Sequence, residues 1–100
     1  MIYRSRTINL GNTKAAASKI AVKAAAYVTE HYPGVEVIIL ENVAGPLAQI
    51  HMVTRCDSLA ALEGYEAKRK TDTEWQKMID EFQALSPDSE SVDHLYRTLV

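Results

Sequence analysis

The stretch GPLAQIHMVTRCDSLAALEGYEAKRK, which runs from Gly45 to Lys70, contains the strand-to-helix transition that decides the fold. Polar and apolar residues alternate over Leu47–Arg55, and a period of two is typical of a half-buried β-strand. The alternation ends at Asp57 and Ser58, either of which can cap a following helix. The stretch therefore predicts a strand that leads into a helix, with His51 in the middle of the strand.

The residues before this stretch predict a strand, a helix and a second strand. Ile2–Leu10 is short, rich in β-forming residues and followed by a Gly-Asn-Thr turn signal. From Lys14 to about His31 the chain is rich in alanine, with apolar residues at helical spacing, and a Pro-Gly pair ends this helix. Val35–Val43 is dominated by β-branched and aliphatic residues, so we expect it to pair with Leu47–Arg55 in a hairpin.

The residues from Ser58 onward predict helix and then a last strand. Gly64 weakens the helix that begins after Ser58, and Thr71 with Glu74 forms a second capping box. We therefore expect one broken helix or two consecutive ones. An apolar stripe at helical spacing then comprises Trp75, Met78, Ile79, Phe82 and Leu85. Val92–Leu99 alternates well enough to form the last strand.

This order of elements is β-α-β-β-α-β, the α+β ferredoxin-like plan, in which an antiparallel sheet carries both helices on one face. We expect a single domain over residues 1–100, because this length suits one domain. In a monomer the other face of the sheet would be exposed to water. We therefore expect a homodimer in which these faces of the two sheets pack against each other.

Composition excludes several classes of protein. A net charge of −2 argues against a nucleic-acid binder, and the basic run Lys68–Lys70 precedes acidic residues, as at a solvated helix end. Cys56 is the only cysteine, so no intrachain disulfide can form, which fits a reducing compartment. No secretory signal and no apolar run of membrane-spanning length is visible. We expect a cytoplasmic protein without a membrane partner.

Several short motifs are similar to those of the NIPSNAP family. IYRSRTINL resembles the opening strand of that family, and GPLAQIHMVTRCDSLAAL and DTEWQKM resemble its third strand and second helix. The resemblance implies a dimeric α/β barrel, in which two ferredoxin-like sheets face each other. Some members of that superfamily are cofactor-free monooxygenases of quinone-type substrates, some degrade haem, and many have no assigned reaction. The haem-degrading members would need an asparagine and a histidine that this chain lacks in the matching places.

The candidate site residues come from two strands. If Ile50 and Met52 face the helices, alternation sends Gln49, His51 and Arg55 into the barrel. The family-like register places Arg4 and Arg6 on the same interior face, together with Ile8. These residues could line a cleft for an anionic or enolate-bearing small molecule, with His51 as general base and an arginine steadying the charge.

The alternative for these charged residues is a polar dimer interface with internal ion pairs. Glu36 or Glu41 would then supply the countercharge. Tyr65, next to Gly64, could place a hydroxyl at the mouth of the cleft, although packing is its more common role. Trp75 is expected in the core because it lies on the apolar stripe, and the alternative is a platform for a substrate.

Two functional hypotheses follow. One is an enzyme like the cofactor-free monooxygenases, acting on a small aromatic or quinone-type molecule without metal or other cofactor. The alternative is a non-catalytic small-molecule-binding or structural homodimer. An enclosed cleft with convergent polar groups would favour the first, and a barrel filled by side chains would favour the second.

Overall fold

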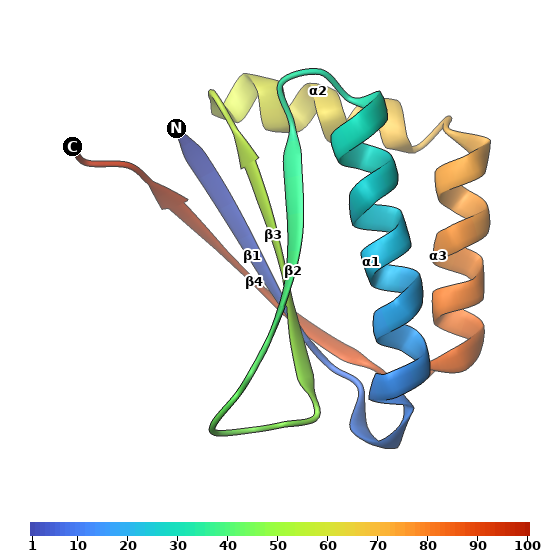
Figure 1. Ribbon diagram of the computed structural model, residues 1–100. Helices are drawn as coiled ribbons and strands as arrows, with labels where there is room; N and C mark the ends of the chain where they lie inside the picture. The colour runs from blue at the N-terminus through green and yellow to red at the C-terminus, as the bar shows by residue number, and fades with distance from the viewer.

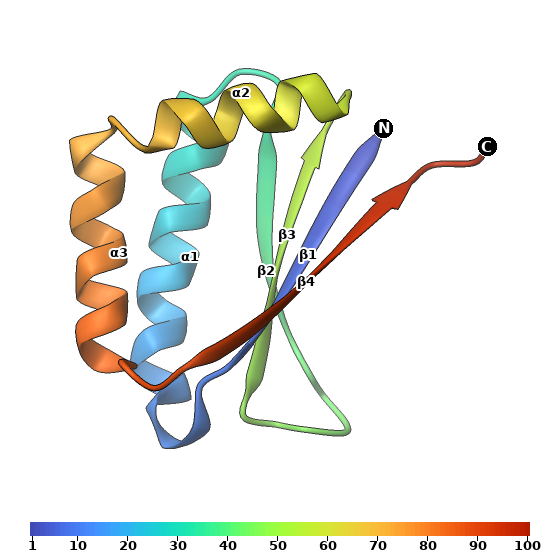
Figure 2. The ribbon, with the colours of Figure 1, turned by 180° about the vertical axis from the view of Figure 1, so that it is seen from behind.

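A computed structural model describes all residues, 1–100. Four strands form one antiparallel sheet in the order β2-β3-β1-β4, and all three α-helices lie on one of its faces (Figures 1 and 2). The strands are β1 (Ile2–Asn9), β2 (Glu36–Glu41), β3 (Gln49–Cys56) and β4 (Glu90–Arg97). The helices are α1 (Lys14–His31), α2 (Leu59–Arg69) and α3 (Thr73–Leu85), and a short 3-10 turn, η1 (Gly11–Thr13), precedes α1. The predicted ferredoxin-like order is confirmed.

The second helical segment consists of two consecutive helices, α2 and α3. Ser58 caps α2, since its side chain accepts a hydrogen bond from the backbone N–H of Ala61. The predicted capping box at Thr71 is wrong, because the N-cap of α3 is Asp72. The Thr71 hydroxyl instead donates to the carbonyl of Lys68 at the end of α2.

Helix α1 packs closely on the sheet because its inward face is built from small side chains. Its buried alanines are Ala17, Ala21, Ala24 and Ala25. Helix α2 lies across one end of the sheet, and α3 runs beside α1 on the side away from β2 (Figure 1). No side chain of α3 is buried, whereas α1 contributes five buried residues. Trp75, which was expected in the core, is half-buried and packs against the edge of the larger core cluster.

Asp72 fixes the start of α3 to α1. Its carboxylate accepts hydrogen bonds from the hydroxyl of Tyr27, at 2.9 and 3.0 Å, and from that of Tyr32, at 2.6 Å. It also accepts the backbone N–H of Trp75 at 3.1 Å. Desolvation alone would raise the pKa of the Asp72 carboxyl, but the hydrogen bonds from Tyr32, Trp75 and Tyr27 together hold that pKa below its ordinary value.

The face of the sheet opposite the helices is open. Large apolar side chains on this face are about half exposed, and they include Ile38, Leu40, Val92 and Tyr96. Strand β4 is exposed along its whole length, so the helices cover mainly the other three strands. None of the helices combines the length and the apolar character that a membrane span requires.

Replacing Asp72 by alanine should destabilise the fold by removing a helix cap and leaving two tyrosine hydroxyls without their acceptor. We expect Asp72→Ala to lower the free energy of unfolding at pH 7 by about 2–3 kcal/mol. Because the folded-state pKa of Asp72 is lowered, the contribution of its charge is fully present above about pH 4 and is lost as the pH falls through the folded-state pKa. Urea denaturation at several pH values measures this, with the exposed Asp80→Ala on the same helix as control. Equal midpoints for the two variants would contradict the assignment.

Candidate functional site

Strand β1 presents two arginines to the helix side of the sheet. In the antiparallel register, Arg4 lies opposite Thr54 and Arg6 lies opposite Met52. Directly opposed residues share a face, and both Thr54 and Met52 are buried beneath the helices. Arg4 and Arg6 therefore lie on the helix side.

The prediction that these two arginines share a face with His51 is wrong. His51 lies opposite Thr7, so it belongs to the open face of the sheet. The physical reason is that Ile2 and Ile8, at the two ends of β1, are both core residues. A period of two then forces every even position between them onto the core side, whatever its polarity.

A cleft of about 330 Å³ lies between the sheet and helices α1 and α3. This volume is in the range of small-molecule sites. Eight of its thirteen lining residues are hydrophobic, and two are arginines, Arg6 and Arg69. Its apolar walls include Met52 from the sheet and Trp75, Ile79 and Phe82 from α3. Three residues of the apolar stripe of α3 thus line a cleft, and two of them, Trp75 and Phe82, also pack against the core.

Arg4 is the most deeply buried of the arginines, with 3% of its surface exposed. One Nη of Arg4 pairs with Glu66 of α2, while its Nε and its other Nη are buried without an acceptor in the chain. Burial, followed by the neighbouring guanidinium groups of Arg6 and Arg69, lowers the pKa of Arg4. Arg4 therefore retains donors that the protein leaves unpaired.

Arg6 forms an ion pair with Asp93 on the neighbouring strand β4 through two of its three guanidinium nitrogens. Its Nε and Nη2 donate to the two carboxylate oxygens at 2.8 and 2.9 Å, a bidentate pair. This hydrogen bonding raises the pKa of Arg6 and holds the pKa of Asp93 below its ordinary value. The countercharges for Arg4 and Arg6 are thus Glu66 and Asp93. The expectation of Glu36 or Glu41 is wrong for these two arginines, but Glu36 does pair with Arg55.

Arg69 was missed as a site residue by sequence reasoning. Its guanidinium lies 4.5 Å from the ring centroids of both Tyr65 and Trp75, and only 8% of its surface is exposed. The prediction of a solvated helix end at Lys68–Lys70 is therefore wrong for its middle residue. Leu62, Tyr65 and Arg69 are spaced i, i+3, i+7, and this shared helical face could have indicated its burial.

The three arginines and two carboxylates leave one excess positive charge beside the cleft. Arg69 has no carboxylate within 4.0 Å, and its Nε and Nη1 are buried without an acceptor in the chain. A buried guanidinium that lacks hydrogen bonds is costly in free energy unless a bound group supplies an acceptor. The arrangement is suited to stabilising an oxyanion on an apolar ligand.

The other predicted site residues lie away from the cleft. Tyr65 is buried behind Arg69 with 4% of its surface exposed, so it does not reach the mouth, and burial raises the pKa of its hydroxyl. Arg55 lies on the open face and pairs with Glu36 at 3.7 Å. Gln49 accepts a hydrogen bond from Asn42 at 3.4 Å. The structure brings Arg4 and Arg6 together with Arg69 and separates them from His51 by the thickness of the sheet.

Both ring nitrogens of His51 have partners within the chain. Nδ1 lies 2.9 Å from the hydroxyl of Thr7, and Nε2 lies 2.6 Å from the side-chain oxygen of Asn42. The Asn42 amide nitrogen in turn donates to the carbonyl of Pro46. Since an amide oxygen only accepts, Nε2 carries a hydrogen and donates it. His51 thus joins β1 to the β2–β3 connection.

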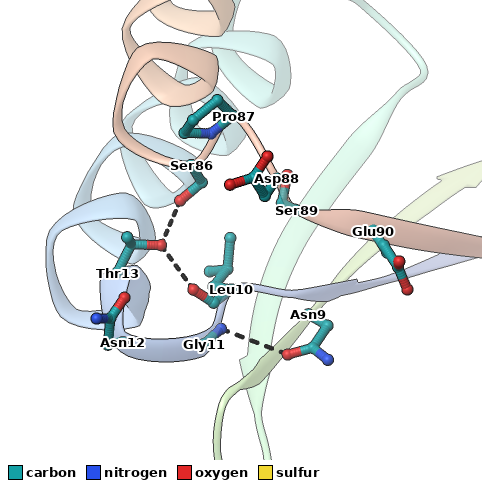
Figure 3. Close-up of a pocket in the computed structure, with 10 residues that line it drawn as sticks. All are labelled: Asn9, Leu10, Gly11, Asn12, Thr13, Ser86, Pro87, Asp88, Ser89 and Glu90. Carbon is teal, nitrogen blue, oxygen red and sulfur yellow. Dashed lines mark hydrogen bonds between the residues drawn. The ribbon is translucent and has the colours of Figure 1, made fainter.

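A second, polar hollow of about 400 Å³ lies where η1 meets the loop after α3 (Figure 3). The Thr13 hydroxyl donates to the carbonyl of Leu10 at 2.7 Å and also contacts the hydroxyl of Ser86. The Asn9 side chain accepts from the backbone N–H of Gly11 at 3.4 Å. These groups join the turn before α1 to the loop after α3.

No group of three His, Cys, Asp or Glu side chains that could hold a metal occurs anywhere in the structure.

Comparison with known proteins supports the fold. No protein-family model and no curated protein matches the chain by sequence. Among solved structures, a candidate antibiotic biosynthesis monooxygenase from Nitrosomonas europaea has a TM-score of 0.77 at 12% identity, covering 100% of both chains. An uncharacterised NIPSNAP domain protein from Burkholderia xenovorans has a TM-score of 0.76 at 15% identity, covering 100% of this chain and 98% of that one. SnoaB, a cofactor-independent oxygenase from Streptomyces nogalater, has a TM-score of 0.72 at 13% identity, covering 99% and 93%.

These similarities show that the chain has the ferredoxin-like fold of such proteins. They agree with the resemblance in the sequence motifs, which also pointed to NIPSNAP and to cofactor-free monooxygenases. At these identities the likeness concerns the fold, and the site has to be argued from its own residues.

His51→Ala should lower stability without changing ligand affinity in the helix-side cleft. Loss of two side-chain hydrogen bonds at a half-buried position is expected to lower the free energy of unfolding by about 1–3 kcal/mol. Thermal melts measure this change, and His94→Ala, an exposed histidine on the same face of the sheet, is the control. A His51→Ala protein that melts like the wild type but loses turnover would restore His51 as a catalytic residue.

Proposed function

We propose that this chain forms a homodimeric, cofactor-independent oxygenase that acts on a small aromatic or quinone-type molecule in the cleft between the sheet and helices α1 and α3. The observation that carries the proposal is the pairing of an apolar cleft with an excess guanidinium at its wall. Arg6 and Arg69 supply positive charge, and Trp75 and Phe82 supply flat apolar surface. This combination suits a ring system that bears a developing oxyanion.

The proposed reaction oxidises an acidic ring methylene to a carbonyl. Ionisation of the substrate gives an enolate, whose oxygen is stabilised by Arg6 and Arg69, and the proton passes to solvent. Molecular oxygen takes four electrons from the methylene carbon. One of its oxygen atoms becomes the new carbonyl oxygen, and the other leaves as water with the two hydrogens. The part played by the protein is to make the methylene more acidic and to orient the ring.

A second candidate is a non-catalytic binding protein. No histidine or carboxylate lines the cleft, so the protein offers no general base there. The oxygenase proposal therefore requires that the guanidinium groups alone make the substrate acidic enough. A binding protein would need only the affinity of the same cleft.

Two features support the proposed dimer and location. The open face of the sheet bears half-exposed apolar residues, among them Ile38 and Leu40 of β2, that a second copy would cover. Such a dimer would leave both clefts on the outer, helix side. The single thiol, Cys56, is unpaired and buried, which suits a reducing compartment such as the cytoplasm.

Anthrone, a three-ring molecule with an acidic methylene, tests the reaction. We expect the purified protein to accelerate oxygen uptake and quinone formation from anthrone without added cofactor. Arg6→Gln should lower the rate by about 10²-fold, as loss of an oxyanion donor does. Arg55→Gln, on the other face of the sheet, is the matched control and should leave the rate unchanged. If wild-type protein gives only the uncatalysed rate, the binding function is favoured.

Light scattering tests the proposed dimer. We expect a particle of twice the 11.1 kDa chain mass. Ile38→Glu, which places a charge on the open face, should shift the particle to the mass of one chain. Val22→Glu, at a similarly exposed site on α1, should leave the dimer intact. A wild-type protein of single-chain mass at micromolar concentration would refute the proposed assembly.

A further inference from the structure

We infer that the ligand of the cleft carries a carboxylate, bound by Arg69, on an aromatic body. This inference rests on the proposed function only in using the same cleft, and it does not require that the ligand be oxidised.

The first step is the state of Arg69. The rings of Tyr65 and Trp75 lie against its guanidinium, each centroid 4.5 Å away. Hydrogen bonds from a guanidinium run in its plane, so the rings do not satisfy its donors. Its Nε and Nη1 are buried without an acceptor in the chain, 8% of the residue is exposed, and the residue is one of those that line the cleft. Arg69 thus lies between two aromatic rings beside the cleft, with two donors that the chain leaves unpaired.

The second step is the charge. Arg4 has Glu66 and Arg6 has Asp93, whereas Arg69 has no carboxylate within 4.0 Å. The neighbouring arginines are close enough for Arg69 to lower the pKa of Arg4. The three arginines and their two carboxylate partners therefore carry one net positive charge. A bound monoanion neutralises this charge, whereas a dianion would leave a net negative charge.

The third step is the shape of the missing group. A carboxylate is planar, carries one negative charge and matches the donor geometry of a guanidinium. The remaining walls of the cleft are largely apolar and include Trp75, Ile79 and Phe82. The ligand that fits both requirements is an aromatic monocarboxylate.

Binding of 2-naphthoate and its uncharged isostere 2-naphthamide tests the inference on the wild-type protein. Trp75 is the only tryptophan and lines the cleft, so quenching of its fluorescence reports occupancy. We expect 2-naphthoate to bind at least tenfold more tightly than 2-naphthamide. Arg69→Gln should weaken 2-naphthoate about 10- to 100-fold and leave 2-naphthamide nearly unchanged. Arg55→Gln, the matched arginine on the open face, should retain the full preference.

The outcomes separate this inference from the proposed oxygenase. Equal affinities for the two naphthalenes in the wild type, or tighter binding of 2-naphthyl phosphate than of 2-naphthoate, would overturn the carboxylate site and leave the oxygenase proposal intact. A tenfold preference for 2-naphthoate in a protein that does not oxidise anthrone would support the carboxylate site and count against the oxygenase. Binding of neither naphthalene would overturn the inference. The wild-type comparison decides the matter even if Arg69→Gln does not fold.

Discussion

The structure depends on one unusual constraint, which is that strand β1 places two arginines on the core side of the sheet. Ile2 and Ile8 hold the ends of the strand against the helices, so Arg4 and Arg6 between them cannot turn outward without moving both isoleucines into water. Buried guanidinium groups need acceptors. Glu66 from α2 and Asp93 from β4 provide them, and these two ion pairs join the sheet to α2 and β1 to its edge strand.

The cleft follows from the same constraint. Helix α1 covers the sheet closely through alanines, whereas α3 carries large side chains and has none fully buried. The carboxylate of Asp72 ties the beginning of α3 to Tyr27 of α1 and to Tyr32, the residue that follows α1. The space between α3 and the arginine-bearing sheet remains as the cleft. Closing it would press apolar side chains such as Phe82 onto charged groups, at a desolvation cost.

Much of the fold could be predicted from the sequence because its signals are local. Every strand and α-helical region could be located from alternation, alanine-rich helical spacing and turn residues, and α1 is correct at both ends. The strand ends differ from the prediction by at most two residues, and the cap of α3 was misassigned. The facing of β1 could not be derived in this way. Tyr3, Ser5 and Thr7 on the other face are themselves polar, so polarity did not distinguish the two faces. The family-like register then assigned the arginines to the wrong face.

The partners of the site residues were even less accessible to sequence reasoning. Glu66 is 62 residues from Arg4, and Asp93 is 87 residues from Arg6, so no local pattern joins them. Arg69 was visible as one residue of a basic run, and such runs are usually solvated. Its burial depends on Trp75, which belongs to another helix and reaches it only because the chain turns between α2 and α3.

The two faces of the sheet have different chemistry. The open face suits contact with a second copy of the chain, and the helix side suits binding of a ligand. The helix side holds the arginines and the cleft, whereas the open side holds His51 in a hydrogen-bonded chain with Thr7 and Asn42, amid half-exposed apolar residues. A partner that covered the open side would exclude water from the hydrogen bonds of His51 without touching the cleft. Arg6 is the point of contact between the two regions, because its bidentate partner Asp93 stands on β4, the strand that the helices leave exposed. A partner that covered β4 would shield the Arg6–Asp93 pair from water, and so would act on the charge that the cleft presents to its ligand.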